Sequence, residues 1–311
     1  MSVSVFVDGA AGTTGLEIGE RLAGRADIAL ITLPEERRKD PQARTDALKS
    51  ADVAILCLHD DAAREAVALI GDAPTRVIDA STAHRTDPAW TYGFPELDVG
   101  QREAIATAQR VSNPGCYPTG FLALVRPLVS AGIVPAYLPL SVNAVSGYSG
   151  GGKSLIARFE DQAAAGATAT GLRLYGLGLG HKHVPEMQTH GGLELPPIFL
   201  PAVARTYRGM TVEVPLHLMT LNGGIDDIRE ALHDAYADSD VVRVIDETPD
   251  ELLIERCAGS DRLEIFVYSE PKTGQVRLVA LLDNLGKGAA GAAVQNLNLM
   301  AGLKETAGLR L

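Results

Sequence analysis

The sequence has few of the residues that mark special classes of protein. Its 311 residues include only 3 cysteines and 1 tryptophan, and aromatic residues make up 5% of the chain. Cys57, Cys116 and Cys257 show neither a disulfide pattern nor the spacing of metal ligands. We therefore expect a reducing compartment, no metal site and at most one reactive thiol.

Positive charge and long apolar runs are also scarce. The formal net charge is -11, and no basic run is longer than the short patch at 37–39. A surface that binds nucleic acid or an anionic membrane normally has the opposite charge balance. No stretch reaches about 18 uninterrupted apolar residues, and the first residues lack the basic region of a signal peptide. We expect a soluble cytoplasmic protein that binds neither nucleic acid nor membrane.

Short apolar strands alternate with helices in the first 115 residues. The expected elements are strands at 3–7, 28–33, 53–58 and 76–79, with helices at 16–22 and 62–70. Strands separated by helices are typical of βαβ units and of a parallel, doubly wound sheet. The fold class predicted for this part is α/β, with a Rossmann-like N-terminal domain.

The pattern changes after about residue 130, where strands become longer and helices fewer. The expected elements are strands at 137–145, 211–219, 263–268 and 275–282, and helices at 153–165, 225–236 and 288–303. Several of these strands alternate apolar and polar residues, which is typical of antiparallel sheets with one covered face. The second domain is therefore predicted to be an α+β catalytic domain with a mainly antiparallel sheet.

A glycine-rich loop joins the first expected strand to the first helix. Gly9, Gly12 and Gly15 flank Thr13 and Thr14 in this loop. Glycines let the backbone approach a pyrophosphate, and the helix N-terminus offers N–H groups and partial positive charge. The spacing GxxGxxG differs from the usual GxGxxG, so a turn without a ligand is the alternative. Its place at the start of a βαβ unit favours a dinucleotide site.

The residues after the second strand bear on the choice of cofactor. A Rossmann domain usually places there the residue that contacts the ribose. This sequence has Glu35 and Glu36, which favour NAD, followed by Arg37 and Arg38, which favour the 2′-phosphate of NADP. NADP is the preferred expectation, and a solvated charged turn is the alternative for any one of these residues.

Residues 147–154, Gly-Tyr-Ser-Gly-Gly-Gly-Lys-Ser, match the phosphate-binding pattern GxxxxGK[ST] of a P-loop. A P-loop phosphotransferase is therefore the rival function from another class. The N-terminal nucleotide fold and the lack of a clear second acidic strand, apart from the one ending at Asp283, weigh against it. We expect instead that Ser146, Gly147 and Lys153 bind the phosphate of a small substrate.

The most informative segment is Ser-Asn-Pro-Gly-Cys-Tyr-Pro-Thr at 112–119. The Pro-Gly pair before Cys116 predicts a turn, and the Tyr-Pro pair after it predicts the first residues of a helix. The dipole and open N–H groups of that helix would stabilise a thiolate. A thiolate attacks acyl carbons and leaves a thioester that accepts hydride. A buried structural cysteine is the common alternative, which we expect for Cys57.

This segment does not stand alone. Three further segments accompany it: Asp-Ala-Ser-Thr-Ala-His-Arg at 79–85, His-Lys-His-Val-Pro-Glu at 181–186, and Asp-Asn-Leu-Gly-Lys-Gly at 283–288. Together they resemble the compact branch of the N-acetyl-gamma-glutamyl-phosphate reductase family over nearly the whole chain. The glycine-rich loop is shared with relatives such as the aspartate-semialdehyde dehydrogenases. His84, where phenylalanine is more usual, and the Gly-Gly-Lys153 form of the loop depart from the family pattern.

The resemblance implies a reaction. It is the NADPH-dependent reduction of N-acetyl-glutamyl 5-phosphate to the 5-semialdehyde and phosphate, a step of arginine biosynthesis. A dehydrogenase acting on aspartyl phosphate is the alternative within the same class. By the resemblance, Cys116 is the nucleophile and His181 with His183 is the proton shuttle. Glu186 then belongs to the substrate site, where it orients one of the histidines, and His183 has a slight edge as the base because it precedes a helix.

The resemblance also implies how the chain is divided. Arg85 would grip the phosphate or carboxylate of the substrate, and Asn284 would return to the cofactor near the nicotinamide. We therefore expect residues 1–115 with 284–311 to bind NADP, and residues 116–283 to carry catalysis and oligomerisation. Relatives of this kind are homo-oligomers, so a dimer or tetramer is expected, with a small anionic acyl phosphate as the substrate.

Overall fold

The computed structural model describes residues 2–37 and 40–311, which form two compact units. The first unit runs from the N-terminus to Pro95 and includes Gly100–Pro114 and Ala289–Leu309. The second unit comprises Glu96–Val99, Gly115–Gly288 and Arg310–Leu311. Arg38, one of the two arginines expected to favour NADP, lies outside the described residues.

The first unit is built on a six-stranded sheet with the order β2-β1-β3-β4-β6-β5, in which every pair of neighbours is parallel. Its strands are β1 (Val3–Asp8), β2 (Ile28–Ile31), β3 (Val53–Leu56), β4 (Arg76–Asp79), β5 (Thr91–Tyr92) and β6 (Arg110–Ser112). Its helices are α1 (Thr13–Leu22), the 3-10 turn η1 (Glu35–Arg37), α2 (Pro41–Ser50), α3 (Asp60–Ile70), α4 (Gln101–Thr107) and α9 (Gly291–Met300). This confirms the predicted parallel α/β sheet.

Helices cover both faces of this sheet, because successive strand side chains point to opposite sides. From β1, Val5 packs with α1, α4 and α9, whereas Phe6 packs with α2 and α3 on the other face. Both layers are apolar, which explains why the strands are continuous runs of Val, Ile and Leu. The glycine-rich loop therefore leaves the sheet at the carboxyl end of β1, where such folds bind their ligands.

The second unit has a seven-stranded mixed sheet with the order β11-β12-β13-β10-β7-β9-β8. Its strands are β7 (Ser141–Gly147), β8 (Leu172–Leu174), β9 (Ile198–Ala204), β10 (Met210–His217), β11 (Val242–Ile245), β12 (Leu263–Glu270) and β13 (Gln275–Leu282). Only the pairs β11–β12 and β7–β9 are parallel. The prediction of a mainly antiparallel sheet is confirmed.

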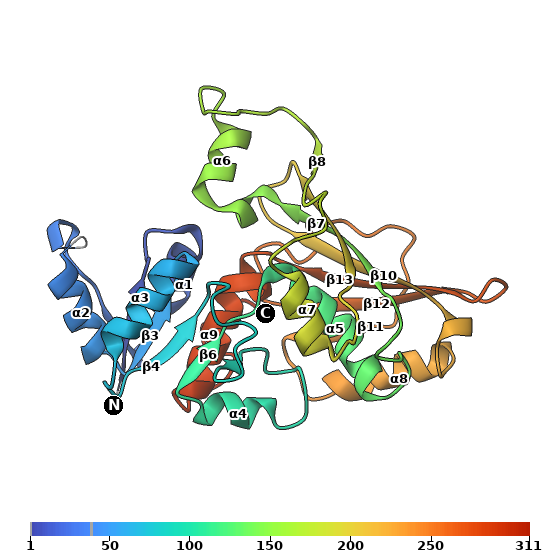
Figure 1. Ribbon diagram of the computed structural model, residues 1–311, viewed down its shortest axis with the longest axis horizontal. Coiled ribbons are helices and arrows are strands. Elements are labelled where there is room, and N and C mark those ends of the chain that lie inside the picture. Colours follow the sequence, from blue (N-terminus) through green and yellow to red (C-terminus); the bar gives the residue numbers. More distant parts are fainter. Residues whose placement is uncertain (1, 38–39) are drawn as a thin grey trace. The chain divides into compact units, whose positions relative to one another are not determined.

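The helices of the second unit lie mostly on one side of its sheet (Figure 1). They are α5 (Cys116–Ser130), α6 (Gly152–Glu160), α7 (Val184–Gly191) and α8 (Ile225–Tyr236), with the 3-10 turns η2 (Tyr148–Gly151) and η3 (Leu218–Thr220). The π turn η4 (Gly286–Ala290) begins in this unit and ends in the first. Helix α5 packs between the sheet and the helices α7 and α8. A helix in that position must be apolar on every side, and most of its residues are buried.

Most ends of the predicted elements lie within three residues of those in the structure, and two lie further away. The strand expected from residue 137 begins only at Ser141, because Pro135 and Pro139 have no N–H to donate to a ladder. The helix expected to reach residue 165 ends at Glu160, where the chain turns back so that the backbone N–H of Thr168 donates to Arg158. In both cases the local backbone hydrogen bonding sets the end of the element, and apolar periodicity alone does not define that end.

Candidate active site

Cys116 is the first residue of α5, as the turn pattern predicts. Gly115 is the N-cap and has no side chain, so the N-terminus of a 15-residue helix opens beside the thiol. The thiol itself is half-buried. This is the environment in which a helix dipole and backbone N–H groups favour thiolate.

Glu186 ties the helix α7 to the turn that carries the nucleophile. Its Oε1 accepts a hydrogen bond from the backbone N–H of Gly115 at 2.8 Å, and the residue is 1% exposed. The resemblance placed Glu186 in the substrate site as the residue that orients a histidine. The contact seen in the structure is with the backbone one residue before Cys116, so this carboxylate fixes the turn.

His181 and His183 lie side by side in the segment before α7. Their ring centroids are 4.8 Å apart, and the ring of Tyr117 lies 6.3 Å from His181 and 5.9 Å from His183. Because Tyr117 follows Cys116 directly, the pair belongs to the surroundings of the nucleophile. The structure thus places both histidines around the ring of the residue that follows Cys116.

The environment of His181 favours its neutral form. Burial lowers the pKa of His181 below its ordinary value of 6.5, the charge of Lys182 lowers it further, and Glu186 opposes both. The backbone N–H of His183 donates to Nδ1 of His181 at 3.1 Å. For Nδ1 to accept, the proton of the neutral ring must sit on Nε2, so this bond also selects the tautomer.

Two tyrosines that the sequence did not single out complete the cluster. The hydroxyl of Tyr175 donates to that of Tyr117 at 3.1 Å, and Tyr117 in turn donates to the carbonyl of Ala202 at 3.0 Å. Burial and the charge of Cys116 together raise the pKa of Tyr175 to about 12, although the hydrogen bond with Tyr117 acts in the opposite direction. Both phenols are therefore neutral near pH 7. Only the position of Tyr117 beside the cysteine offered a signal for them.

The glycine-rich loop after β7 does not have the form of a P-loop. Residues 148–151 form the 3-10 turn η2, and β7 lies in a mixed sheet, parallel to β9 and antiparallel to β10, whereas a P-loop leaves a parallel sheet. Ser146 is buried and hydrogen bonds to Tyr117, while Lys153 on the first turn of α6 is exposed. Of the three residues expected to hold phosphate, Ser146 adjoins the nucleophile cluster. Gly147 follows it at the end of β7.

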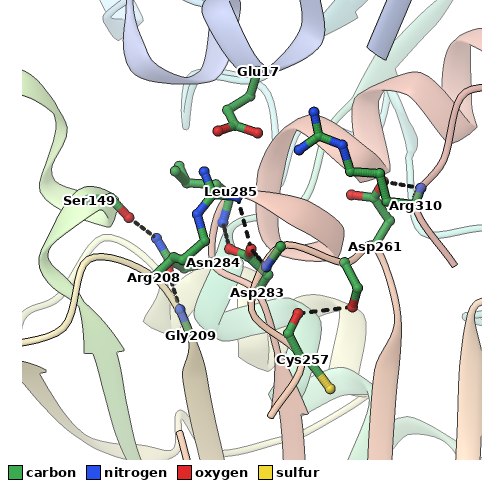
Figure 2. Close-up of polar contacts among 12 residues, drawn as sticks. Glu17, Ser149, Arg208, Gly209, Cys257, Asp261, Asp283, Asn284, Leu285 and Arg310 are labelled. Atoms are coloured by element: carbon green, nitrogen blue, oxygen red, sulfur yellow. Dashed lines mark hydrogen bonds and ion pairs between the residues drawn. The ribbon is translucent and has the colours of Figure 1, made fainter. Parts of the chain in front are cut away.

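Asn284 is held within the second unit on both sides of its amide (Figure 2). Its Nδ2 donates to Oγ of Ser149 at 2.8 Å, and its Oδ1 accepts from the backbone N–H of Gly209 at 3.0 Å. The residue is 1% exposed. Its amide therefore joins the turn η2 to the start of β10, in addition to the cofactor contact that the resemblance implies.

Comparison with known proteins assigns the chain to a family. A family model described as "Semialdehyde dehydrogenase, NAD binding domain" matches residues 4–108, and one described as "Semialdehyde dehydrogenase, dimerisation domain" matches residues 116–284. The N-acetyl-gamma-glutamyl-phosphate reductases of Brucella ovis and Brucella melitensis are each 54% identical to it over 309 residues, covering 97% of this chain and 100% of each relative. The chain belongs to the N-acetyl-gamma-glutamyl-phosphate reductase family.

This member of the reductase family is also similar to solved structures. Aspartate semialdehyde dehydrogenase II from Vibrio cholerae matches with a TM-score of 0.76 at 17% identity, covering 97% of this chain and 99% of that one. Aspartate semialdehyde dehydrogenase with NADP from Candida albicans matches with a TM-score of 0.63 at 13% identity, covering 96% and 98%. At these identities the likeness shows the fold alone, and it agrees with the predicted fold class.

In this reductase-family chain the loop after β1 has the shape of a backbone cradle. Gly9 has φ +86°, and a Cβ there would lie 2.3 Å from the carbonyl oxygen of Cys57. A Cβ on Gly15 would lie 2.5 Å from the carbonyl oxygen of Gly9. Helix α1 begins at Thr13 with Gly12 as its N-cap, so no side chain covers its first N–H groups. The loop therefore fits a dinucleotide pyrophosphate.

The residues expected to contact the cofactor phosphate and the substrate lie elsewhere in the first unit. Arg37 is exposed in the turn η1 and pairs with Asp40 at 3.3 Å. Arg85 is buried, and its Nε and Nη2 donate to the backbone carbonyls of Asn113 at 3.0 Å and Ala80 at 2.9 Å. These bonds give Arg85 a part in shaping the chain before Cys116, and its contact with the substrate stays a prediction.

His84, the departure from the usual phenylalanine, keeps the packing of an aromatic ring. It stacks on Trp90 with a centroid distance of 4.1 Å, and its Nδ1 lies 2.7 Å from Oδ2 of Asp79. His84 therefore combines aromatic stacking on Trp90 with a hydrogen bond to a buried carboxylate.

Two further findings concern the part of the chain that the structure describes. No helix within it is long and apolar enough to cross a membrane. No group of three or more His, Cys, Asp or Glu side chains within it is arranged to hold a metal ion.

Proposed function

We propose that this chain reduces N-acetyl-glutamyl 5-phosphate to N-acetyl-glutamate 5-semialdehyde and phosphate, with NADPH as the reductant, as a cytoplasmic enzyme of arginine biosynthesis. The observation that carries the proposal is Cys116 at the start of α5, with the His181–His183 pair packed around the ring of the next residue, Tyr117. Membership of a family whose relatives bear the name of this reductase supports the choice of substrate.

In the first step Cys116 supplies the nucleophile. Its sulfur attacks the acyl carbon of the substrate, the bond from that carbon to the phosphate oxygen breaks, and phosphate leaves with the electron pair. A histidine takes the thiol proton. The product of this step is a thioester on Cys116.

In the second step bound NADPH supplies a hydride to the thioester carbon. The resulting hemithioacetal collapses when the bond between carbon and sulfur breaks, which releases the semialdehyde and the Cys116 thiolate. The histidine that took the thiol proton in the first step is now an imidazolium and returns that proton to the thiolate. The other histidine stays neutral and stabilises charge on the oxygen by donating a hydrogen bond.

The two histidines have different roles in this proposal. Nδ1 of His181 already accepts the N–H of His183, so a neutral His181 offers an N–H at Nε2 and suits donation to the substrate oxygen. His183 lies at the N-cap of α7, where the helix dipole disfavours imidazolium. It therefore releases its proton readily, which favours it as the residue that exchanges protons with Cys116.

The cofactor and the substrate anion are assigned to separate groups. Gly9, Gly12 and Gly15 with the first turn of α1 at Thr13 and Thr14 would hold the pyrophosphate, and Arg37 and Arg38 the 2′-phosphate of NADP. Arg85, Lys153 and the Ser146–Gly147 turn would bind the anionic group of the substrate. Glu186 would hold the turn that precedes the nucleophile. Asn284 positions the loop around Ser149 and, as the family resemblance implies, would contact the cofactor.

A phosphate-dependent oxidation assay tests the function. N-acetylglutamate semialdehyde and aspartate semialdehyde are offered side by side with NADP and phosphate, and NADPH formation is followed by absorbance. We expect turnover with the acetylated substrate and at most traces with the other. Preference for aspartate semialdehyde would favour the alternative activity, that of an aspartate-semialdehyde dehydrogenase. No turnover with either substrate would contradict both activities.

We also propose that the chain works as a homo-oligomer. The strands β8 and β9 expose apolar side chains at the edge region of their sheet, namely Leu172, Leu174, Ile198 and Leu200. The family model that covers this unit is described as a dimerisation domain. Light scattering after gel filtration should give a mass at least twice that of the 32.8 kDa chain. A monomer at micromolar concentration would refute this part of the proposal.

A further inference from the structure

The turn from Asp283 to Gly288 is fixed by bonds to distant loops (Figure 2). Oδ2 of Asp283 accepts the N–H of Gly259 at 2.6 Å and pairs with Arg208 at 3.3 Å, while its Oδ1 accepts the N–H of Leu285 at 2.8 Å. Asp283 is fully buried. Together with the Asn284 amide described above, these bonds leave the turn little freedom to move.

Gly288 at the end of this turn lies against the nucleophile. A Cβ on Gly288 would lie 2.9 Å from Cβ of Cys116 and 3.0 Å from the carbonyl oxygen of Asp283. Real Cβ atoms essentially never approach this closely, so only glycine fits. The backbone of the turn is therefore a wall beside the Cys116 side chain, and its position limits where the sulfur can point.

The residue before that wall forms a buried ion pair. Nζ of Lys287 lies 2.7 Å from Oε2 of Glu96, and each side chain is 1% exposed. Taking two charges out of water is expensive, so such a pair persists only in a closely defined geometry. Lys287 lies in the π turn η4, a rare conformation that is frequent at functional sites.

We propose that Lys287 and Glu96 are positioning residues for the nucleophile. Their ion pair holds the π turn in place, and Gly288 then fixes the orientation of the Cys116 sulfur for attack on the acyl carbon. The positioning of the thiol does not depend on the identity of the substrate, whereas its use in acyl transfer rests on the function proposed above.

Alkylation by iodoacetamide measures the thiol without any substrate. Burial raises the pKa of Cys57 and of Cys257 to about 12 in each case, so both remain protonated between pH 6 and 9. The rate of modification in this range therefore reports on Cys116, and mass spectrometry of the peptides verifies the site. A pH series gives the titration curve of the thiol.

Two variants test the proposal by different routes. The double variant Glu96→Gln with Lys287→Met removes both charges and leaves no unpaired ion in the interior. Gly288→Ala keeps the ion pair and displaces the backbone of the turn that lies against the Cys116 side chain. Lys272→Met, an exposed lysine, and Gly19→Ala, where a Cβ meets no atom within 4 Å, are the matched controls. Circular dichroism and NADP binding check that each variant is folded.

A displacement of about 1 Å costs roughly a hundredfold in rate at a reacting centre. We expect both test variants to lose about that factor in kcat, with the affinity for NADP unchanged within about twofold. We also expect a shifted alkylation profile and at least about tenfold slower alkylation at pH 7. The single variant Lys287→Arg keeps the positive charge and should lose less kcat than the double variant. The two control variants should match the parent in kcat and in alkylation.

Results that overturn the inference are distinct from failure of the proposed function. A folded double variant, or Gly288→Ala, with the alkylation profile and kcat of the parent would refute positioning by this turn. Should the double variant not fold, Gly288→Ala alone decides. If the parent turns over neither semialdehyde, the proposed function fails, while the alkylation comparison still tests the inference.

Discussion

Cys116 differs from the other two cysteines in its surroundings. Cys57 follows the buried strand β3 and Cys257 lies in an apolar cluster, and burial holds the thiols of both in the protonated form. Cys116 instead lies at the uncapped start of α5, next to Tyr117, whose ring packs against two histidines. The chain thus contains two cysteines that stay protonated and one that is placed for reactivity. The local backbone structure accounts for the difference.

Cys116→Ser should leave NADP binding within about twofold of the parent and reduce turnover more than about 10³-fold, because a hydroxyl at this place cannot form the thioester readily. Steady-state kinetics and fluorescence titration of the cofactor measure the two effects. Cys257→Ala is the matched control and should retain turnover. Near-normal kcat in Cys116→Ser would exclude covalent catalysis through this residue.

The histidine pair predicts an acid limb in the pH profile. Because the pKa of His181 is lowered below 6.5, the ring is neutral near pH 7 and gains its proton only as the pH falls through the lowered value. We expect kcat/KM to fall in that range below pH 6.5. The stability that depends on the neutral ring is complete above pH 6.5 and is lost over the same range.

Single alanine variants separate the two rings. His183→Ala should cost about a hundredfold to ten-thousandfold in kcat, as expected for loss of a general base. His181→Ala should remove the acid limb and weaken substrate binding. Full kcat with an unchanged pH profile in both variants would show that neither histidine moves the proton.

At the scale of elements, the loop from β7 to α6 shows how a motif and a structure can disagree. Residues 147–154 satisfy a P-loop pattern, but the strand before them lies in a mixed sheet and the next residues form the turn η2. Ser149 in that turn is bound to Asn284, which closes the loop onto β13 and away from an open phosphate cradle. The sequence pattern carries no information on that bond.

Lys153 should therefore have no part in binding a nucleotide triphosphate. Isothermal titration with Mg-ATP is expected to show no affinity in the micromolar range, for the parent and for Lys153→Ala alike. In the semialdehyde assay, Lys153→Ala should raise KM for phosphate. ATP hydrolysis that disappears with this substitution would restore the P-loop interpretation.

Local patterns predicted the elements better than the contacts among them. The helix at 225–236 and the strand at 275–282 have the expected bounds, because apolar periodicity and flanking turn residues define them fully. The start of α5 at Cys116 followed from the Pro-Gly turn. The pairing of Lys287 with Glu96 joins residues 191 positions apart, and no local pattern indicates it. Tyr175 joined the site for the same reason, through the packing of β8 on β9.

At the scale of the whole molecule, the net charge of -11 has a consequence for ligands. NADP and an acyl phosphate are both anions, so the mean field of the chain opposes their approach and binding must rely on a few local cations. The uncapped start of α1 and the exposed Arg37 are such local positive groups. Selectivity between two dinucleotides then depends on one or two side chains.

Replacing Arg37 and Arg38 together with alanine should weaken NADP binding by about tenfold or more and leave NAD binding nearly unchanged, because only NADP carries a 2′-phosphate. Fluorescence titration with both cofactors measures the ratio. Arg64→Ala, an exposed arginine of α3, is the control. Equal affinity of the parent for NADP and NAD would refute the assignment.

The burial of most of α5 also bears on which parts of the second unit can open. Amide hydrogens exchange with solvent when a segment opens, and a helix enclosed by a sheet and two helices opens only when the unit unfolds. The amides of α5 should therefore be among the slowest to exchange, whereas the exposed segment at 161–171 has few buried contacts and opens locally. On this prediction, the nucleophile lies on the helix of its unit that is slowest to open. Any motion during turnover then comes from the segments around that helix.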